Sequence, residues 1–236
     1  YNFEWREGDF VITTLDDFIR EFEKVKALGW IKTHRSGPTG VGKTLEDLLG
    51  IPENNLDQPD FGDYELKSCR IDSNSMLTMF TRAPQPARSN TYLRMKYGYS
   101  SGAYENEEKV LHSTLSADRF TPIAGTGHKL KVSCDSDGIY IMSEEGKENV
   151  YWSRDVLKKC FEKKYKNKFV YAKVLSRGER SDEEFKFVEA YEVSGFDYEA
   201  FISLLESGKI YVDLRIGQYH DGKNKGKHMI MVQDSV

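Results

Sequence analysis

The sequence predicts a mixed fold of the α/β (α+β) class, with a central mixed sheet flanked by helices. Short segments in which apolar and polar residues alternate, as in strands, are interspersed with longer segments whose apolar residues recur at helical spacing. Strands and helices in such an order favour an α+β core with loops around it. The 236 residues contain no internal repeat and no low-complexity linker, and this length suits one large domain or two small ones.

The first predicted helix spans residues 15–28, where leucine, phenylalanine, isoleucine and valine recur at helical spacing. Thr14 precedes this segment and is a good N-cap, because its hydroxyl can accept a hydrogen bond from a free amide of the first turn. Asp16 and Asp17 follow at once, where negative charge favours a helix N-terminus. Gly29 can end the helix.

The remaining elements are predicted from the same periodicities and from the turn residues between them. Residues 64–70 and 76–81 are predicted as a hairpin joined by the turn residues 72–74. A glycine-rich loop at 32–42, a short helix at 44–49, a loop at 51–59 and irregular chain over 100–128, which includes His112, are expected. The later part is predicted to contain strands at 129–133, 138–142, 169–175, 185–193 and 210–216, and helices at 154–165 and 198–206.

Composition does not mark the chain as a strongly charged binder. Lys and Arg number 34 against 38 Asp and Glu, which gives a formal net charge of −4. The distribution is uneven, because residues 73–104 contain no acid but carry several arginines and tyrosines. Such a local basic surface can attract DNA whatever the average charge is. The lysine-rich run 158–168 is expected on the solvated face of a helix.

The three cysteines are Cys69, Cys134 and Cys160, and their spacing matches no metal or redox motif. Reduced thiols in a cytoplasmic protein are therefore expected. No apolar run approaches the length of a membrane span, and no signal peptide is recognisable. No membrane partner is expected.

Residues 37–44 read Gly-Pro-Thr-Gly-Val-Gly-Lys-Thr and fit the phosphate-binding P-loop pattern. This pattern alone would predict a nucleotide hydrolase. A P-loop follows a buried apolar strand, however, and residues 31–36 are too polar for one. The chain also has no clear apolar run ending in an Asp that could hold Mg²⁺. The alternative is a glycine loop whose amides and Lys43 meet a phosphate, such as one in a DNA backbone.

A second motif is carried by Asp60, Glu65 and Lys67, which have the form P-D-x₄-E-x-K together with Pro59. Glu65 and Lys67 are two positions apart on a predicted strand and should share one face. A bend can bring the Asp60 carboxylate beside Glu65. Two carboxylates and the Leu66 carbonyl would make a hard oxygen site for Mg²⁺. Lys67 would then orient the attacking water and stabilise charge on a phosphate.

Glu46 lies on the short helix just upstream and could add a further acid to the metal site. With this support, the residues resemble those of the MvaI/BcnI family of restriction endonucleases, which belongs to the PD-(D/E)xK superfamily and is related to the mismatch-repair nicking enzyme MutH. The similar blocks fall in order along nearly the whole chain, at 39–49, 55–57, 59–61, 65–67, 77–81, 90–91, 93–94, 151–153, 212–217, 219–220, 222–223 and 226–227. The last blocks resemble the MvaI-type members most. In this context the P-loop pattern is a coincidence.

The resemblance implies a PD-(D/E)xK restriction-endonuclease-like core in a bacterial cytoplasmic enzyme. Asp60, Glu65 and Lys67 would be catalytic with Mg²⁺, and Glu46 would support them. The catalytic part is expected around 14–100 and a DNA-recognition part around 105–236, which together form a cleft. The enzyme would act as a monomer on double-stranded DNA at a short, nearly palindromic site that is CCWGG-like or CCSGG-like, and the resemblance of the last blocks favours CCWGG. A cognate DNA methyltransferase would be its functional partner.

The resemblance also places Asp213 and Arg215 at the DNA bases, where Arg can donate two hydrogen bonds to guanine. The other expected DNA contacts are Lys43, Arg94, His220, Lys223, Lys225, Lys227 and His228. One departure concerns the end of the chain. In the family the Gly/Lys run leads into a His-rich segment, whereas here His228 is followed directly by Met229.

Three alternatives stay open at this point. A catalytically inactive relative would bind DNA without cutting it. A MutH-like repair enzyme would nick one strand without completing a double-strand break. A P-loop nucleotide hydrolase would bind ATP or GTP through residues 37–44.

Overall fold

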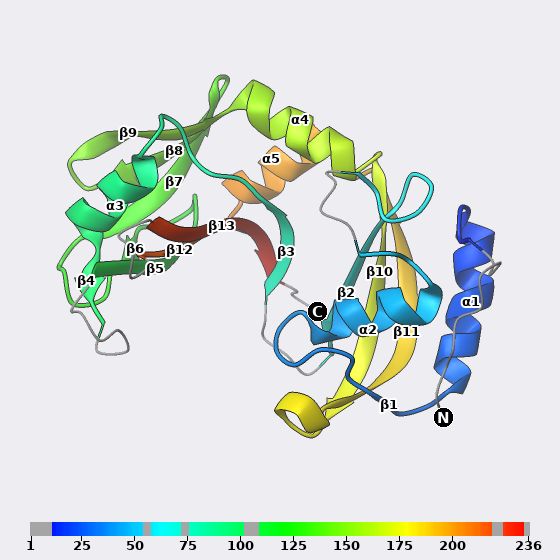
Figure 1. The fold of residues 1–236 in the computed structure, drawn as a ribbon. Helices are drawn as coiled ribbons and strands as arrows, with labels where there is room; N and C mark the ends of the chain where they lie inside the picture. Colours follow the sequence, from blue (N-terminus) through cyan, green and yellow to red (C-terminus); the bar gives the residue numbers. More distant parts are fainter. Residues whose placement is uncertain (1–10, 54–57, 72–75, 102–108, 219–223, 234–236) are drawn as a thin grey trace. The chain divides into compact units, whose positions relative to one another are not determined.

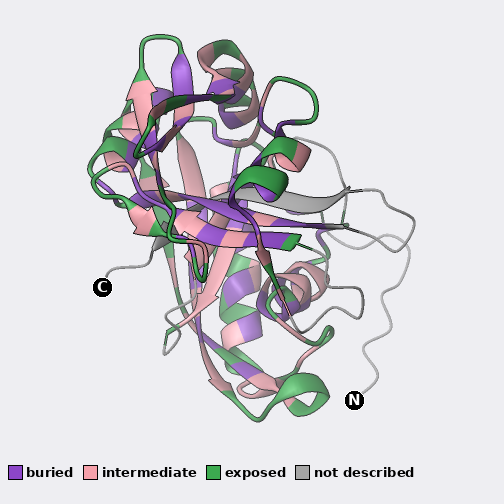
Figure 2. Cartoon of the chain, turned by 90° about the vertical axis from the view of Figure 1, so that its left-hand side faces the viewer, coloured by how far each residue is buried: buried purple, intermediate pink, exposed green. Residues whose placement is uncertain are grey.

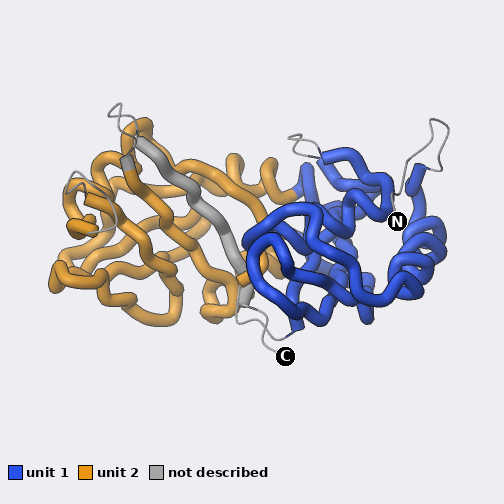
Figure 3. The backbone as a smooth tube through the Cα atoms, turned by 60° about the horizontal axis from the view of Figure 1, so that its bottom comes forward, with its two compact units in different colours: residues 1–75, 162–197 blue, residues 76–161, 198–236 orange. Residues whose placement is uncertain are grey.

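The computed structural model describes residues 11–53, 58–71, 76–101 and 109–217, and the backbone alone at 218 and 224–233. It confirms the α+β class, with five helices and three sheets in the described chain (Figure 1). The chain forms two compact units, each assembled from two separate segments (Figure 3). The first unit contains residues 1–75 and 162–197, and the second contains residues 76–161 and 198–236.

The first unit is built on a four-stranded mixed sheet. The strand order is β1 (Ile31–Lys32), β11 (Glu184–Ser194), β10 (Lys168–Arg177) and β2 (Glu65–Arg70). β2 pairs with β10 in parallel, whereas the other neighbours are antiparallel. Two helices, α1 (Leu15–Ala27) and α2 (Gly40–Leu49), pack on the sheet. β2, which carries the predicted catalytic residues, is therefore the edge strand next to α2.

The core of the first unit lies between the two helices and one face of this sheet. Phe18 of α1 stacks on Phe22 and on Phe61, with ring centroids 5.4 and 5.3 Å apart. Leu45 of α2 and Ala172 of β10 are completely buried in the same cluster. Along the strands, buried residues alternate with more exposed ones, as Figure 2 shows by colour. The opposite face of β2 is left to polar side chains.

The predicted first helix is confirmed, with its N-cap. The Thr14 hydroxyl accepts a hydrogen bond from the Asp17 amide, and the Asp17 carboxylate accepts one from the Thr14 amide, which is a complete capping box. The second helix begins earlier than predicted, at Gly40 rather than at residue 44. A Cβ atom on Gly40 would lie 2.4 Å from the Arg35 carbonyl oxygen, so glycine is needed at this close approach.

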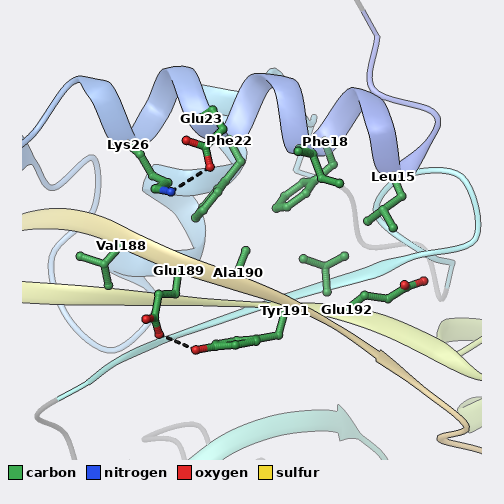
Figure 4. Close-up of a pocket in the computed structure, with 12 residues that line it drawn as sticks. Leu15, Phe18, Phe22, Glu23, Lys26, Val188, Glu189, Ala190, Tyr191 and Glu192 are labelled. Carbon is green, nitrogen blue, oxygen red and sulfur yellow. Dashed lines mark hydrogen bonds and ion pairs between the residues drawn. The ribbon is translucent and has the colours of Figure 1, made fainter.

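A groove of about 370 Å³ runs between α1 and β11 in the first unit (Figure 4). Its floor is apolar, with Leu15, Phe18 and Phe22 facing Val170 and Ala190. Two surface pairs, Lys26 with Glu23 and Tyr191 with Glu189, lie at its rim. None of the predicted catalytic residues lines this groove.

The second unit contains two antiparallel sheets. The five-stranded sheet has the order β3 (Met76–Thr81), β13 (Asn224–Gln233), β12 (Ile210–Gln218), β5 (Lys109–Leu115) and β4 (Tyr99–Ser100). The four-stranded sheet has the order β6 (Thr121–Pro122), β7 (Lys129–Asp135), β8 (Gly138–Ser143) and β9 (Gly146–Ser153). The helices are α3 (Ser89–Tyr97), α5 (Tyr198–Glu206) and the first part of α4 (Arg154–Lys164).

The predicted hairpin over 64–70 and 76–81 is wrong. β2 pairs with β10 and β3 pairs with β13, so the two strands belong to different sheets and different units. The turn residues 72–74 that suggested the hairpin lie outside the described residues. Two predicted strands separated by turn residues are typical of a hairpin. Here, however, each strand pairs with a strand that is distant in the sequence.

Six elements in the second unit were not predicted, namely α3, β4, β5, β6, β9 and β13. No element was predicted over the residues of α3, β5 runs through the stretch expected to be irregular, and β9 follows a short turn at Glu144–Glu145. α3, β5 and β9 are rich in serine, threonine, asparagine or charged residues, which interrupt the regular spacing of apolar residues that predicts helices and strands. The other predicted strands and helices of this part are confirmed to within a few residues. No helix in the described residues is long and apolar enough to cross a lipid bilayer.

A buried carboxylate ties α3 to β9. Glu148 is 8% exposed and accepts hydrogen bonds from the hydroxyls of Tyr92, Tyr97 and Ser143 and from the ammonium of Lys96. Burial alone would raise its pKa, but these four donors together lower the pKa of Glu148 to about 2. The carboxylate therefore stays ionised well below neutral pH.

Replacing Glu148 with Gln is expected to lower the stability of the protein at neutral pH. The folded-state pKa lies below the ordinary value, so the contribution of Glu148 is fully present above about 4.5 and is lost as the pH falls towards about 2. The difference in melting temperature between wild type and Glu148→Gln should therefore shrink in acid. Thermal melts across this pH range test it, with the exposed Glu144→Gln as control. An equal difference at every pH would contradict the assignment.

Candidate active site

A tight turn places Asp60 beside the start of β2. The amides of Asp60 and Phe61 both donate to the Tyr64 carbonyl oxygen, at 2.9 and 3.1 Å. Gly62 in this turn has a φ of +50°, and a Cβ atom there would lie 2.3 Å from the Thr13 carbonyl oxygen. The Asp60 carboxylate then accepts a 2.7 Å hydrogen bond from the Leu66 amide. The turn thus brings the Asp60 side chain against the strand that carries Glu65.

Glu65 is the most buried acid of the site, at 1% exposure. Its Oε1 atom accepts from the Lys67 ammonium at 2.5 Å and from the Lys164 ammonium at 3.1 Å. Its Oε2 atom is buried and has no hydrogen-bond partner among the described residues. Such an atom is costly to bury unless something binds it. Asp60, Glu65 and Lys67 are therefore brought together as the sequence predicts.

Glu46 completes the acidic group from α2. Burial, and then the charges of Asp60 and Glu53, raise the pKa of Glu46 to about 7. Burial, and then the charge of Glu65, also raise the pKa of Asp60 above its ordinary value. Burial and the repulsion of Glu46 by Asp60, and of Asp60 by Glu65, account for these shifts. A divalent cation would relieve this repulsion.

The donor set fits Mg²⁺. No group of three or more His, Cys, Asp or Glu side chains surrounds a common metal position in the described part of the chain. Mg²⁺ does not need one, because it commonly keeps several waters and binds one or two protein carboxylates. The unpartnered Oε2 atom of Glu65, with Asp60 beside it, supplies such oxygens. Asp60, Glu65 and the Leu66 carbonyl remain the predicted metal ligands.

The metal-free protein is expected to lose stability as the pH rises from about 5 to about 7. The folded state holds a proton on Glu46 up to about pH 7, whereas the unfolded chain releases it near the ordinary value of 4.5. The unfolded state binds fewer protons in that window, so the free energy of unfolding falls with pH and levels off above it. Thermal melts in EDTA measure this slope, which Glu46→Gln should flatten. Asp63→Asn, an exposed acid of the same motif, should keep it.

The P-loop pattern does not form a phosphate-binding loop. Residues 42–44 lie inside α2, two residues after its start, rather than in a loop ahead of a helix. Thr44 is completely buried and its hydroxyl accepts from the His34 amide. The Lys43 ammonium lies 2.7 Å from Asp47 and 3.4 Å from Glu53. These contacts give the pattern a structural explanation, and the nucleotide hydrolase has no support from it.

A second polar cluster lies on β12 of the second unit. Asp213 is 1% exposed, and its Oδ1 atom accepts from the Thr114 hydroxyl at 2.6 Å and from the Arg215 guanidinium at 2.9 Å. Its Oδ2 atom is buried without a partner in the described residues. Residues 212, 214 and 216, which alternate with this pair, are completely buried in the core. Arg215, with 40% of its side chain exposed, is therefore held by a fixed carboxylate on the polar face of the sheet.

His112 belongs to this cluster and was not predicted. It lies on β5 as the register partner of Arg215, so the two side chains share a face. Burial, and then the charge of Arg215, lower the pKa of His112. A neutral imidazole, with one donor and one acceptor nitrogen, therefore stands next to the guanidinium at neutral pH. The alternation of residues 110–115 could have indicated the strand, although nothing in the sequence indicated its neighbour.

The other predicted DNA contacts have different outcomes. Arg94 is 5% exposed and its guanidinium donates to the Lys109 carbonyl, which explains it as a structural residue between α3 and β5. Lys225, Lys227 and His228 lie on β13, where only the backbone is described, and Lys227 is the register partner of Arg215. His220 and Lys223 lie outside the described residues.

Glu65 and Lys67 on the edge strand β2, with Asp60 in the turn before it, form a compact polar site, and comparison with known proteins places the chain among the restriction endonucleases. The model of the MvaI/BcnI restriction endonuclease family matches residues 19–231, and the chain belongs to this family. The structure of restriction endonuclease MvaI in complex with its cognate DNA substrate is similar over 94% of both chains, with 30% identity and a TM-score of 0.80. MvaI in the absence of DNA matches over 95% of this chain and 94% of that chain, with 30% identity and a TM-score of 0.58. No curated protein sequence matches the chain.

Proposed function

We propose that this restriction endonuclease is a type II enzyme that hydrolyses phosphodiester bonds of double-stranded DNA with Mg²⁺, at a short pseudopalindromic site of the CCWGG or CCSGG kind. The observation that supports this best is the buried Glu65 carboxylate, which has one oxygen paired with Lys67 and the other without a partner in the described chain. Asp60 lies beside it, fixed by the Leu66 amide. The CCWGG preference follows from the resemblance of the last segment to MvaI-type members.

In the proposed reaction, water attacks phosphorus in line with the bond to the 3′-oxygen. A new P–O bond forms as that bond breaks, so the products carry a 5′-phosphate and a 3′-hydroxyl. Bound Mg²⁺ would polarise the phosphate and acidify the attacking water. Asp60, Glu65 and the Leu66 carbonyl would hold the metal ion, and Glu46 would add charge to the site. The Lys67 ammonium would orient the water and stabilise charge on the phosphate.

The two units would divide the work. The unit that contains Asp60, Glu65 and Lys67 would cut, and the unit that contains Asp213 and Arg215 would read the bases. Arg215 is suited to guanine, because its guanidinium can donate to both N7 and O6 while Asp213 fixes its direction. Lys227, opposite Arg215 in the sheet register, and the neighbouring Lys225 would contact phosphates or bases. His228, His220 and Lys223 are proposed for the same surface.

The enzyme would act as a monomer and cut the two strands of its near-symmetric site in turn. A host that makes such an enzyme has to protect its own sites, so a DNA methyltransferase of the same specificity is the expected functional partner. A MutH-like enzyme that nicks one strand, and a relative that binds DNA without cutting it, are the two rivals within the same fold.

Digestion of a supercoiled plasmid that carries both CCWGG and CCSGG sites separates these possibilities. In Mg²⁺ the wild-type protein is expected to give linear DNA and then discrete fragments, whose ends identify the site. EDTA should abolish cleavage. Nicked circles that never become linear would support the MutH-like rival, and an intact plasmid that is nevertheless bound would support the inactive relative.

A further inference from the structure

A lysine from a distant part of the chain reaches the catalytic carboxylate. Lys164, the last residue of α4, places its ammonium 3.1 Å from Glu65 Oε1, the same oxygen that Lys67 approaches at 2.5 Å. The motif that carries Asp60, Glu65 and Lys67 does not include this residue. One carboxylate oxygen thus has two ammonium partners, while the other oxygen has none in the described residues.

The position of Lys164 is fixed by the aromatic residue that follows it. Tyr165 is almost completely buried, and its ring meets those of Phe169 and Phe196 edge-on, at 5.7 and 5.6 Å between centroids. Phe169 is in turn the register partner of Glu65 on the neighbouring strand. The packing of Tyr165 therefore holds the backbone at residue 164 next to Glu65, and this places the Lys164 side chain within reach of the carboxylate.

The charges at Glu65 explain why a second ammonium is useful. A carboxylate that is 1% exposed is strongly disfavoured unless nearby positive charge compensates it. Asp60 adds a second negative charge within the same site. Lys67 by itself would leave one of these two charges uncompensated. Lys164 supplies the missing charge, and 24% of its side chain is exposed to solvent.

We propose that Lys164 is a resident counter-ion of Glu65, which a divalent metal ion displaces when it binds, so that this lysine limits the metal affinity of the enzyme. The inference rests on the proposed function, because it takes Glu65 as a metal ligand. A cation at Glu65 has to compete with both ammonium groups and is repelled by them. Removing Lys164 takes away one competitor for Glu65 and one charge that repels the cation, and both changes are expected to raise the affinity for the metal ion.

The test is the binding of Mn²⁺ to the full chain without DNA, measured from the loss of the free-ion EPR signal. Mn²⁺ accepts the same oxygen ligands as Mg²⁺. Lys164→Met is expected to bind Mn²⁺ roughly tenfold more tightly than wild type, because one charge at contact distance has been removed. Lys164→Arg keeps the charge and should bind as wild type does. Lys163→Met, the same change one residue earlier on an exposed side chain, should shift the affinity much less.

Circular dichroism establishes that each variant is folded, and Lys164→Gln serves as a second neutral variant. Mn²⁺ binding that is unchanged or weaker in a folded, neutral variant would overturn the inference. Suppose that the neutral Lys164 variants bind Mn²⁺ no more tightly than wild type, while the wild type cuts DNA and Glu65→Gln loses Mn²⁺ binding. The proposed function then stands, and only the role of Lys164 fails. If the wild type neither binds Mn²⁺ nor cuts, the proposed function fails with it.

Discussion

Replacing Lys67 with Ala is expected to slow DNA cleavage by roughly a thousandfold while leaving DNA binding nearly intact. The Lys67 ammonium is proposed to act on the attacking water and on the charge that develops at phosphorus, so its effect is largest in the transition state. Single-turnover cleavage of a short duplex in Mg²⁺ measures the rate. Binding to the same duplex in Ca²⁺ measures affinity without cleavage.

The control for this variant is Asp63→Ala, which removes an exposed charge from the same motif. It should cleave at close to the wild-type rate. Lys67→Ala also leaves Glu65 with one ammonium partner, Lys164, so a folded protein is expected. Cleavage by Lys67→Ala within a fewfold of wild type would remove Lys67 from the mechanism. Loss of DNA binding in parallel with cleavage would assign it to affinity instead.

The second large effect is expected at Arg215. Arg215→Ala should reduce the preference for the cognate site over a site with one changed G·C pair by about 10- to 100-fold, since one bidentate contact to guanine contributes roughly 1–3 kcal/mol of discrimination. The change also leaves Asp213 with the Thr114 hydroxyl as its remaining partner in the described residues, which should weaken cognate binding further. Competition binding with matched cognate and altered duplexes measures the preference directly.

Arg119→Ala is a suitable control, because Arg119 is an exposed arginine of the same unit, paired with Asp118. Its loss removes one positive charge from the surface without affecting the cluster on β12. It should weaken binding to all duplexes alike, if at all. Should Arg215→Ala weaken cognate and altered sites by the same factor, Arg215 would be a phosphate contact and the bases would be read elsewhere.

The sequence predicted those parts of the site that lie close together along the chain. Asp60, Glu65 and Lys67 are near neighbours, and strand alternation alone brings Glu65 and Lys67 to one face. Lys164 was predicted on a solvated face, because the spacing of residues in a helix does not indicate which other element the end of that helix contacts. The structure shows that this end meets β2 through the parallel pairing of β2 with β10.

The same distinction holds for the fold. α1 was predicted with its cap because a capping box is coded within four residues. The hairpin of β2 and β3 was wrong because strand partners are chosen by tertiary packing, and both strands pair across long separations. The cluster of His112, Thr114, Asp213 and Arg215 could not be predicted as a unit, since it depends on the register between β5 and β12.

The pairing of β2 with β10 has a consequence for the living cell that makes the enzyme. Residues 76–161, which belong to the other unit, are translated between the two strands. During synthesis Asp60, Glu65 and Lys67 leave the ribosome well before β10 and Lys164, which complete their surroundings. A nascent or prematurely terminated chain that ends before residue 164 therefore lacks both the sheet partner of β2 and the second ammonium at Glu65. Nuclease activity is therefore expected only from chains that have been synthesised beyond residues 162–197, which complete the first unit.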